Sequence, residues 1–187
     1  MEDLKMELEK LRNDVIEEAH RLGAVLAGFA PVSRWDDFED VPVSHRPKSV
    51  WNETETVISF AVPILLPLIE STPSIHYQEQ YNVANQLLDN LAYRISFFLN
   101  GRGYASIFMA RDGYGSLDIL RRKPIASFSH VYAGKYAGLG TVGVNHMLLT
   151  PGYGPRVRLV SVLTSARFEG SPLQEKELCE FCDCCIK

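Results

Sequence analysis

The chain has 187 residues, of which 46% are hydrophobic and 22% are charged, so it can bury the core of one globular domain. Its formal net charge of -4 excludes a generally basic surface of the kind that binds nucleic acids. The most apolar stretch, residues 58–69, is too short to cross a bilayer, and the first 22 residues lack the apolar segment of a signal peptide.

The N-terminal third predicts one helix and two strands. Apolar residues recur every three or four positions over residues 4–22, which indicates an amphipathic helix that ends at Gly23. Residues 24–30 have the pattern of a short buried strand. A polar, proline-containing connection at 31–55 leads to a second strand at 56–64, which is rich in β-branched residues.

The middle of the chain contains the clearest helical pattern. After a loop expected at 66–76, one stripe of apolar residues predicts a core-facing helix that is closed by Gly101 and Gly103. The residues of this stripe are Tyr81, Ala84, Leu88, Leu91, Ile95 and Phe98. A third strand is expected at 104–110, and a turn at 112–116.

The C-terminal third predicts a short helix followed by two strands. Ser129 is a suitable N-cap for the helix. The strands are expected at 146–150 and 156–164, joined by the turn "PGYGP" at 151–155. Helices and strands are mixed without strict alternation, so we expect an α+β fold in which helices pack on a sheet.

Three glycines, Gly138, Gly140 and Gly143, form a GxGxxG string that resembles a dinucleotide-binding fingerprint. That fingerprint requires a preceding strand, a following helix and an acidic residue about 20 positions later. Here a helical pattern comes before the string and a strand pattern comes after it, so we reject a dinucleotide site. The glycines then indicate either a tight helix-to-strand turn or a backbone wall against a large flat cofactor.

All four cysteines lie in the last nine residues, which does not suit a disulfide framework and favours a reducing, cytoplasmic location. Cys179, Cys182 and Cys185 follow the C-x2-C-x2-C spacing of a [4Fe-4S] site, while Cys184 falls outside it. The next ligand of such a run would lie two residues beyond Lys187, so we expect a chain that is cut inside the motif. Zinc with a histidine from elsewhere, or a tail without metal, remain the alternatives.

Three strings occur in order along the chain: "DGYG", "FSHVYAGKYAGLGTVGVNHMLLTPGYGPRVRLVSVLT" and "CEFCDCC". Together they resemble the epoxyqueuosine reductase-like iron–sulfur proteins, which are relatives of the corrinoid reductive dehalogenases. The resemblance covers nearly the whole chain and is strongest over residues 112–164 and at the cysteines.

The resemblance implies a nitroreductase-like corrinoid-binding domain over residues 1–175. It further implies that residues 176–187 begin a truncated ferredoxin-like segment that carries [4Fe-4S] clusters. Cobalamin and a [4Fe-4S] cluster, whose ligand set is incomplete in this chain, are the cofactors expected on this basis. The expected partners are a corrinoid, a small-molecule or modified-nucleoside substrate, and reduced ferredoxin or flavodoxin as electron donor, with no membrane.

The chain departs from this family at one position. The tRNA-acting members carry an aspartate as proton donor upstream of "AGLG", whereas "RKPIASF" at residues 122–128 contains no acid. His130 and Tyr132 are therefore our candidate catalytic residues. Gly138, Gly140 and Gly143, together with Asn145 and Arg156, are the candidate cofactor-binding residues.

These observations favour a cobalamin-dependent, iron–sulfur-linked reductase of unknown substrate. Two other functions stay open. The first is a non-enzymatic electron-transfer or corrinoid-carrying module. The second is a flavin-dependent nitroreductase-like enzyme in which the cysteines have no part in the chemistry.

Overall fold

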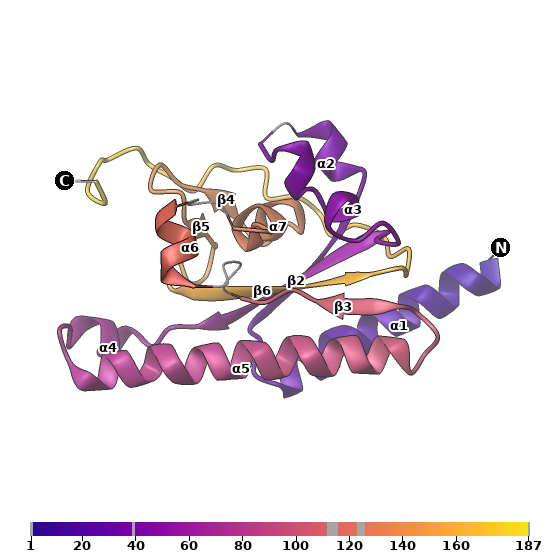
Figure 1. The fold of residues 1–187 in the computed structure, drawn as a ribbon, viewed down its shortest axis with the longest axis horizontal. Coiled ribbons are helices and arrows are strands. Elements are labelled where there is room, and N and C mark those ends of the chain that lie inside the picture. Colours follow the sequence, from indigo (N-terminus) through magenta and orange to yellow (C-terminus); the bar gives the residue numbers. More distant parts are fainter. Residues whose placement is uncertain (1, 39, 112–115, 123–125, 187) are drawn as a thin grey trace.

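A computed structural model describes residues 2–38, 40–111, 116–122 and 126–186 (Figure 1). Its elements in chain order are α1 (Glu2–Arg21), β1 (Leu26–Pro31), α2 (Arg34–Asp37), η1 (Val43–His45), α3 (Pro47–Val50), β2 (Thr56–Pro63), α4 (Leu66–Glu70), α5 (Ile75–Asn100), β3 (Ser106–Phe108), α6 (Leu117–Arg122), α7 (His130–Tyr136), β4 (Thr141–Val142), β5 (Leu148–Leu149) and β6 (Val157–Thr164). This mixture of helices and strands confirms the predicted α+β fold, while the more specific nitroreductase-like arrangement stays a prediction.

One four-stranded antiparallel sheet, in the order β1-β2-β6-β3, forms the centre of the molecule. β2 and β6 pair over eight residues each, with Ser59 opposite Ser161. β3 pairs with only the last part of β6, and its final partner is Val162. The first half of β6 therefore has no strand partner on that edge among the described residues. The strands β4 and β5 form a separate two-stranded hairpin.

The sheet separates two layers of elements (Figure 1). α1 and α5 cover one face, where side chains such as Ile58, Phe60 and Leu91 form one buried cluster. On the other face, α7 and the segments around α2 and the β4–β5 hairpin form a second buried cluster, which contains Trp35 and Tyr136. The alternation of side chains along β2 and β6 supplies residues to both clusters.

The long central helix forms as its apolar stripe predicts. α5 begins after Ser74, whose hydroxyl accepts a 3.2 Å hydrogen bond from the backbone nitrogen of Tyr77. The middle of the stripe is buried against the sheet, whereas Tyr81, near the start of the helix, is 38% exposed. The stripe therefore leaves the core at its N-terminal end, and this end lies beside a cavity described below.

The structure corrects several boundaries. Part of the loop expected at 66–76 is helical, because Pro67 favours the first turn of α4 and α5 already begins at Ile75. The connection expected at 31–55 contains α2, η1 and α3. α6 was not predicted, and the strands expected at 104–110 and 146–150 shorten to β3 and β5. Of the turn expected at 112–116, residues 112–115 lie outside the described residues.

The short helix α7 begins as expected. Ser129 caps it by accepting a 3.4 Å hydrogen bond from the backbone nitrogen of Tyr132. The other end of α7 is tied to α2 and to the C-terminal segment, because the Arg34 guanidinium donates to the carbonyl oxygens of Tyr136 and Ser171. Within the described residues, none of the helices is both long and apolar enough to cross a membrane.

Candidate functional site

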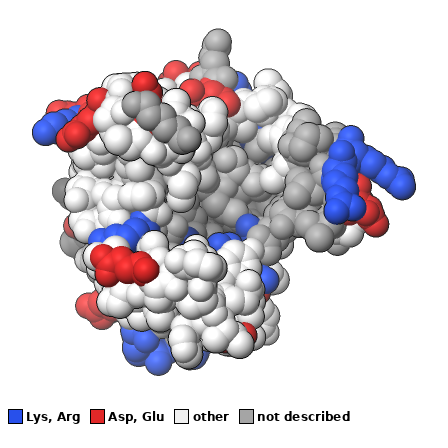
Figure 2. Space-filling model, turned by 90° about the vertical axis from the view of Figure 1, so that its left-hand side faces the viewer, with Lys and Arg blue, Asp and Glu red and all other residues white. Residues whose placement is uncertain are grey.

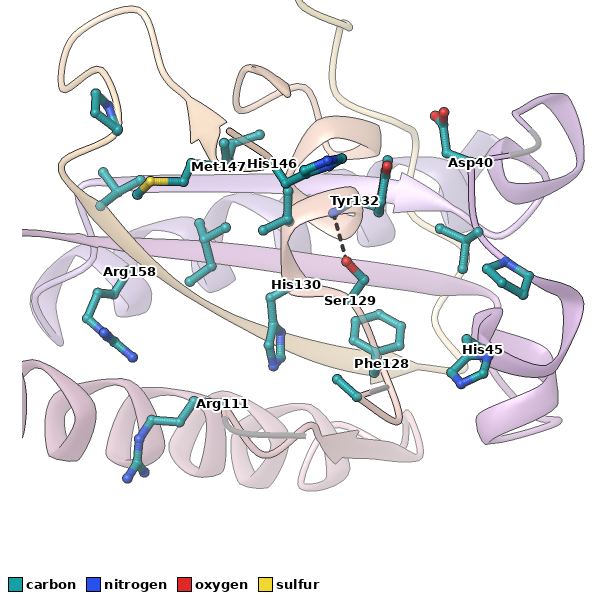
Figure 3. Close-up of a pocket in the computed structure, with 18 residues that line it drawn as sticks. Asp40, His45, Arg111, Phe128, Ser129, His130, Tyr132, His146, Met147 and Arg158 are labelled. Atoms are coloured by element: carbon teal, nitrogen blue, oxygen red, sulfur yellow. Dashed lines mark hydrogen bonds between the residues drawn. The ribbon is translucent and has the colours of Figure 1, made fainter. Parts of the chain in front are cut away.

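A cavity of about 600 Å³ lies on the α7 face of the sheet, and Figure 2 shows the molecule hollowed on the side where it opens. Its walls come from the segment before α3, the first turn of α7, the β4–β5 hairpin and the first half of β6 (Figure 3). The lining is apolar over Val41, Phe128, Leu148, Val157 and Leu159, with polar side chains among them. The described lining residues with ionisable side chains are Asp40, His45, Arg111, His130, Tyr132, His146 and Arg158.

His130, predicted as a catalytic residue, lies in this cavity at the start of α7. Its Nε2 atom is 3.0 Å from the carbonyl oxygen of Ala110, which can only accept a hydrogen bond. Nε2 therefore carries the proton in the neutral ring. Nδ1, 2.9 Å from the hydroxyl oxygen of Ser161, then accepts. These bonds fix the orientation of the imidazole.

Tyr132, the second predicted catalytic residue, also lines the cavity, beside a charged cluster. In this cluster the ammonium of Lys135 and the hydroxyl of Tyr136 donate to the same carboxylate oxygen of Asp40, at 2.5 and 3.2 Å. Burial, followed by the negative charge of Asp40, raises the pKa of Tyr136.

The turn of the β4–β5 hairpin places His146 against the cavity. His146 has φ of 59°, in the left-handed region that few residues other than glycine adopt. Its backbone nitrogen donates to the carbonyl oxygen of Gly143, and the side-chain oxygen of Asn145 accepts from the backbone nitrogen of Met147 at 3.1 Å. Asn145 thus serves the turn in this structure, and its predicted contact with a cofactor stays a prediction.

The glycines of the "AGLGTVG" string pack against the chain itself. A Cβ atom on Gly138, which has φ of 77°, would collide with the carbonyl oxygen of Pro172. A Cβ on Gly140 would collide with the carbonyl oxygen of Leu149 in the facing strand of the hairpin. Neither of these glycines, nor Gly143, is among the residues that line the 600 Å³ cavity. Close packing thus explains two of these glycines, and a role against a cofactor is untested.

A second cavity of about 310 Å³ adjoins the first, since Met147, Pro155, Val157 and Arg158 line both. Arg156, predicted to bind a cofactor, lines this smaller cavity and not the larger one. Its guanidinium lies 3.5 Å from the carbonyl oxygen of Ile64.

The cysteine segment leaves the domain beside β4. The carboxylate of Glu177 accepts hydrogen bonds from the Thr141 hydroxyl at 2.6 Å and from the backbone nitrogens of Leu178 and Cys179 at 3.1 and 3.2 Å. These bonds, the one from Thr141 first, lower the pKa of Glu177. Cys179 is half-buried, whereas Cys182, Cys184 and Cys185 are exposed, and all four are free thiols.

The predicted metal ligands do not converge in this structure. In the part of the chain that the structure describes, no group of three or more histidine, cysteine, aspartate or glutamate side chains is placed to hold a metal ion. The donor set itself, three thiolates at C-x2-C-x2-C spacing, suits an iron–sulfur cluster. A cluster would therefore require the exposed residues from Cys182 to Cys185 to rearrange around it.

His130 and Tyr132, predicted as catalytic residues from the sequence, both line the cavity, whereas other lining residues were not predicted. Arg158 was detectable, because residues two apart on a strand share a face and Arg156 had been selected. His146 adjoins the selected Asn145. Asp40 and His45 carry no local signal, since only the packing of the 40–45 segment against α7 brings them to the cavity.

No protein-family model matches the chain, and no curated protein matches it. Solved structures do share its fold. An epoxyqueuosine reductase bound to a tRNA-Tyr stem loop superimposes with a TM-score of 0.69 and 17% identity, covering 96% of this chain and 51% of that one. The enzyme from Streptococcus thermophilus gives a TM-score of 0.63, 18% identity, and coverage of 94% and 51%.

A catabolic reductive dehalogenase in complex with 3-bromo-4-hydroxybenzoic acid also superimposes, with a TM-score of 0.63 and 18% identity. This match covers 86% of the present chain and 22% of the dehalogenase. The chain thus spans about half the length of the epoxyqueuosine reductases and less of the dehalogenase. These matches confirm the predicted resemblance at the level of the fold.

Proposed function

We propose that this chain is the corrinoid-binding part of a cobalamin-dependent, iron–sulfur-linked reductase, with the 600 Å³ cavity as its cofactor and substrate site. The observation that carries the proposal is the position of this cavity. It is a mostly apolar hollow on the α7 face of a sheet whose fold resembles that of epoxyqueuosine reductases and of a reductive dehalogenase described as B12-dependent. A concave pocket with a largely apolar surface and polar side chains among it suits a small molecule or cofactor.

The lining supports a corrinoid in two respects. Leu148, Val157 and Leu159 would offer an apolar surface to a flat macrocycle, and polar lining residues such as His45 and His146 would supply hydrogen-bond partners for its amides. A bound cobalamin would supply the reducing metal centre. The chain would contribute the walls that limit water, and a proton from His130 or Tyr132, the two predicted catalytic residues that line the cavity.

In this proposal, Cys179, Cys182 and Cys185 would hold a [4Fe-4S] cluster, which would supply one-electron transfer, and reduced ferredoxin or flavodoxin would be the external electron donor. The bonds of Glu177 to Thr141 and to the Cys179 backbone hold the start of this segment against β4. β4 pairs with β5, and Leu148 of β5 lines the cavity. The segment is therefore attached to a wall of the proposed cofactor site.

Cobalamin titration of the isolated chain tests this proposal. Saturable quenching of tryptophan fluorescence, together with a change in the visible spectrum of the corrinoid, is expected at one site. Val157→Trp should fill the junction of the two cavities and weaken binding at least tenfold. Val83→Trp is the matched control, because Val83 is 61% exposed on α5 and does not line either cavity.

Both variants should melt within a few degrees of the parent chain, so that a loss of binding reports the site. If cobalamin does not bind saturably, or if the folded Val157→Trp protein binds it as well as Val83→Trp does, the proposed site is wrong. A carrier would bind cobalamin equally well, so turnover with a chemical reductant is needed to separate the reductase from a corrinoid-carrying module.

A further inference from the structure

The smaller cavity of about 310 Å³ lies where the sheet is incomplete. β3 ends at Phe108, opposite Val162, so the first half of β6 lacks a strand partner on that edge among the described residues. Ile69 of α4 and Tyr77, Gln80 and Tyr81 in the first turns of α5 form the facing wall of this pocket. Its lining consists of Ile64, Ile69, Tyr77, Gln80, Tyr81, Met147, Pro155, Arg156, Val157 and Arg158.

Two side chains that line this pocket have buried polar atoms that form no hydrogen bond within the described residues. The Oε1 and Nε2 atoms of Gln80 and the Nε atom of Arg158 are all buried and have no hydrogen-bond partner within the described residues. Folded proteins pair nearly all such atoms, because a buried donor or acceptor that loses its bonds to water is costly. These three atoms have almost no exposed surface, so a ligand in the pocket would pair with them only after the Gln80 and Arg158 side chains turn toward it.

The charge of the pocket indicates what kind of ligand this is. Arg156 and Arg158 are its charged residues, and neither forms an ion pair within the described residues. No carboxylate is among the described residues that line it. The Arg158 guanidinium stacks on the ring of Tyr81, with 4.3 Å between its central carbon and the ring centroid. This contact fixes the planar group, whose donors match carboxylate and phosphate oxygens.

We propose that the smaller cavity binds the oxyanion group, carboxylate or phosphate, of a small molecule that has an apolar body. Arg158 pairs with the oxyanion, and the amide of Gln80, once it turns toward the pocket, bonds to a polar group beside it. Ile64, Ile69 and Val157 contact the apolar part.

Because Val157 and Arg158 line both cavities, a molecule anchored here extends toward His130 in the larger one (Figure 3). The inference rests on the proposed function for the reaction that follows, but the binding itself needs no cofactor.

The test is a set of titrations of the full 187-residue chain without cobalamin. Benzoate, phenyl phosphate and benzamide serve as probes, with binding followed by ligand-observed NMR. Benzoate or phenyl phosphate should bind saturably, and the one that binds more tightly identifies the oxyanion. Benzamide has the same ring but no charge, and should bind at least tenfold more weakly than the preferred anion.

Arg158→Met keeps an apolar side chain against Tyr81 and should weaken binding of the preferred anion at least tenfold. Arg158→Lys keeps the charge but not the planar guanidinium. Its affinity for the preferred anion should fall between those of the wild type and Arg158→Met. Gln80→Leu removes the amide and should weaken binding several-fold. Arg167→Met is the matched control, because the Arg167 side chain is 78% exposed and pairs with Glu55 away from this pocket. Melting curves establish that each variant is folded.

If neither benzoate nor phenyl phosphate binds saturably, the proposal is wrong. The same holds if binding is equal for benzamide, or is unchanged in folded Arg158→Met. These results are separable from the test of cobalamin binding. If cobalamin binds and the anions do not, this proposal fails alone, whereas anion binding without cobalamin binding leaves the smaller site in place and removes the proposed cofactor.

Discussion

His130 at the start of α7 and Ser161 in the middle of β6 are joined by a 2.9 Å contact between the imidazole Nδ1 and the serine hydroxyl. The contact crosses from the helical layer to the sheet. It couples the orientation of a cavity-lining side chain to the most central pairing of the sheet, because Ser161 lies opposite Ser59 of β2.

This relationship predicts the tautomer of His130. Since the carbonyl oxygen of Ala110 accepts from Nε2, neutral His130 should carry its proton on Nε2, and long-range ¹⁵N–¹H NMR spectra of the imidazole can show this. Ser161→Ala should destabilise the fold by about 1–2 kcal/mol, because it removes the hydroxyl that hydrogen-bonds to Nδ1 of His130. A proton found mainly on Nδ1 would contradict the assignment.

Ser59→Ala provides the matched control for that substitution. The Ser59 hydroxyl is buried, and no hydrogen-bond partner for it occurs in the described part of the chain. Removing the Ser59 hydroxyl should therefore lower the free energy of unfolding by less than removing the Ser161 hydroxyl does. Urea unfolding of the two variants measures this difference.

Gly140→Ala should destabilise the protein by about 1–3 kcal/mol, since its Cβ would overlap the carbonyl oxygen of Leu149 and push the β4–β5 hairpin apart. For a chain of this size, the expected fall in melting temperature is on the order of 2–4 °C per kcal/mol. Gly152→Ala is the control, because, apart from its two chain neighbours, no described residue has an atom within 4 Å of its Cβ position.

A Gly140→Ala protein as stable as Gly152→Ala would show that the hairpin does not require glycine. If the glycines also form a cofactor wall, Gly140→Val should lose more than tenfold in cobalamin affinity. Equal affinity in that variant would leave Gly140 with a packing role alone.

Tyr136→Phe should reduce the fall in the free energy of unfolding that the wild type shows at alkaline pH. Because burial raises the pKa of Tyr136 in the folded chain, the neutral phenol favours folding. That contribution is fully present below the unfolded pKa of about 10 and is lost as the pH rises above it. Urea unfolding from pH 8 to 11 should show a steeper loss in the wild type than in Tyr136→Phe. Tyr93→Phe, which removes a phenol from a 58% exposed side chain, should follow the wild type.

Cys185→Ser should lower the iron and sulfide that the chain retains after anaerobic reconstitution with an added thiol, whereas Cys184→Ser should not. The C-x2-C-x2-C spacing uses Cys179, Cys182 and Cys185, and the adjacent Cys184 cannot reach the same cluster without strain. Equal losses in both variants would contradict this ligand set, and unchanged retention in Cys185→Ser would show that Cys185 is not a ligand. A wild-type chain that retains neither iron nor sulfide would favour a tail without a cluster.

Elements that a local residue pattern marks could be predicted from the sequence. α5 was predicted because its apolar stripe repeats with the helical period, and α7 because Ser129 is a suitable cap. The cavity was not predictable in the same way. Asp40, His130, His146 and Arg158 come from four separate segments, and only the sheet register and the packing of α7 bring them together.

Gly140 illustrates the same limit at a single position. The glycine-rich string indicated a close approach of two groups, but not which groups approach. Its partner is the backbone of Leu149, nine residues further along, and that contact exists only once the hairpin has formed.

The two buried clusters on opposite faces of the sheet allow the two layers to differ in local stability. The layer of α1 and α5 has a continuous apolar interior, whereas the α7 layer contains the larger cavity. Local opening of the α7 layer can then occur without global unfolding. A bound ligand would slow amide hydrogen exchange in α7 and the hairpin while leaving α1 unchanged, so the scaffold stays rigid while the face that meets the ligand adapts to it.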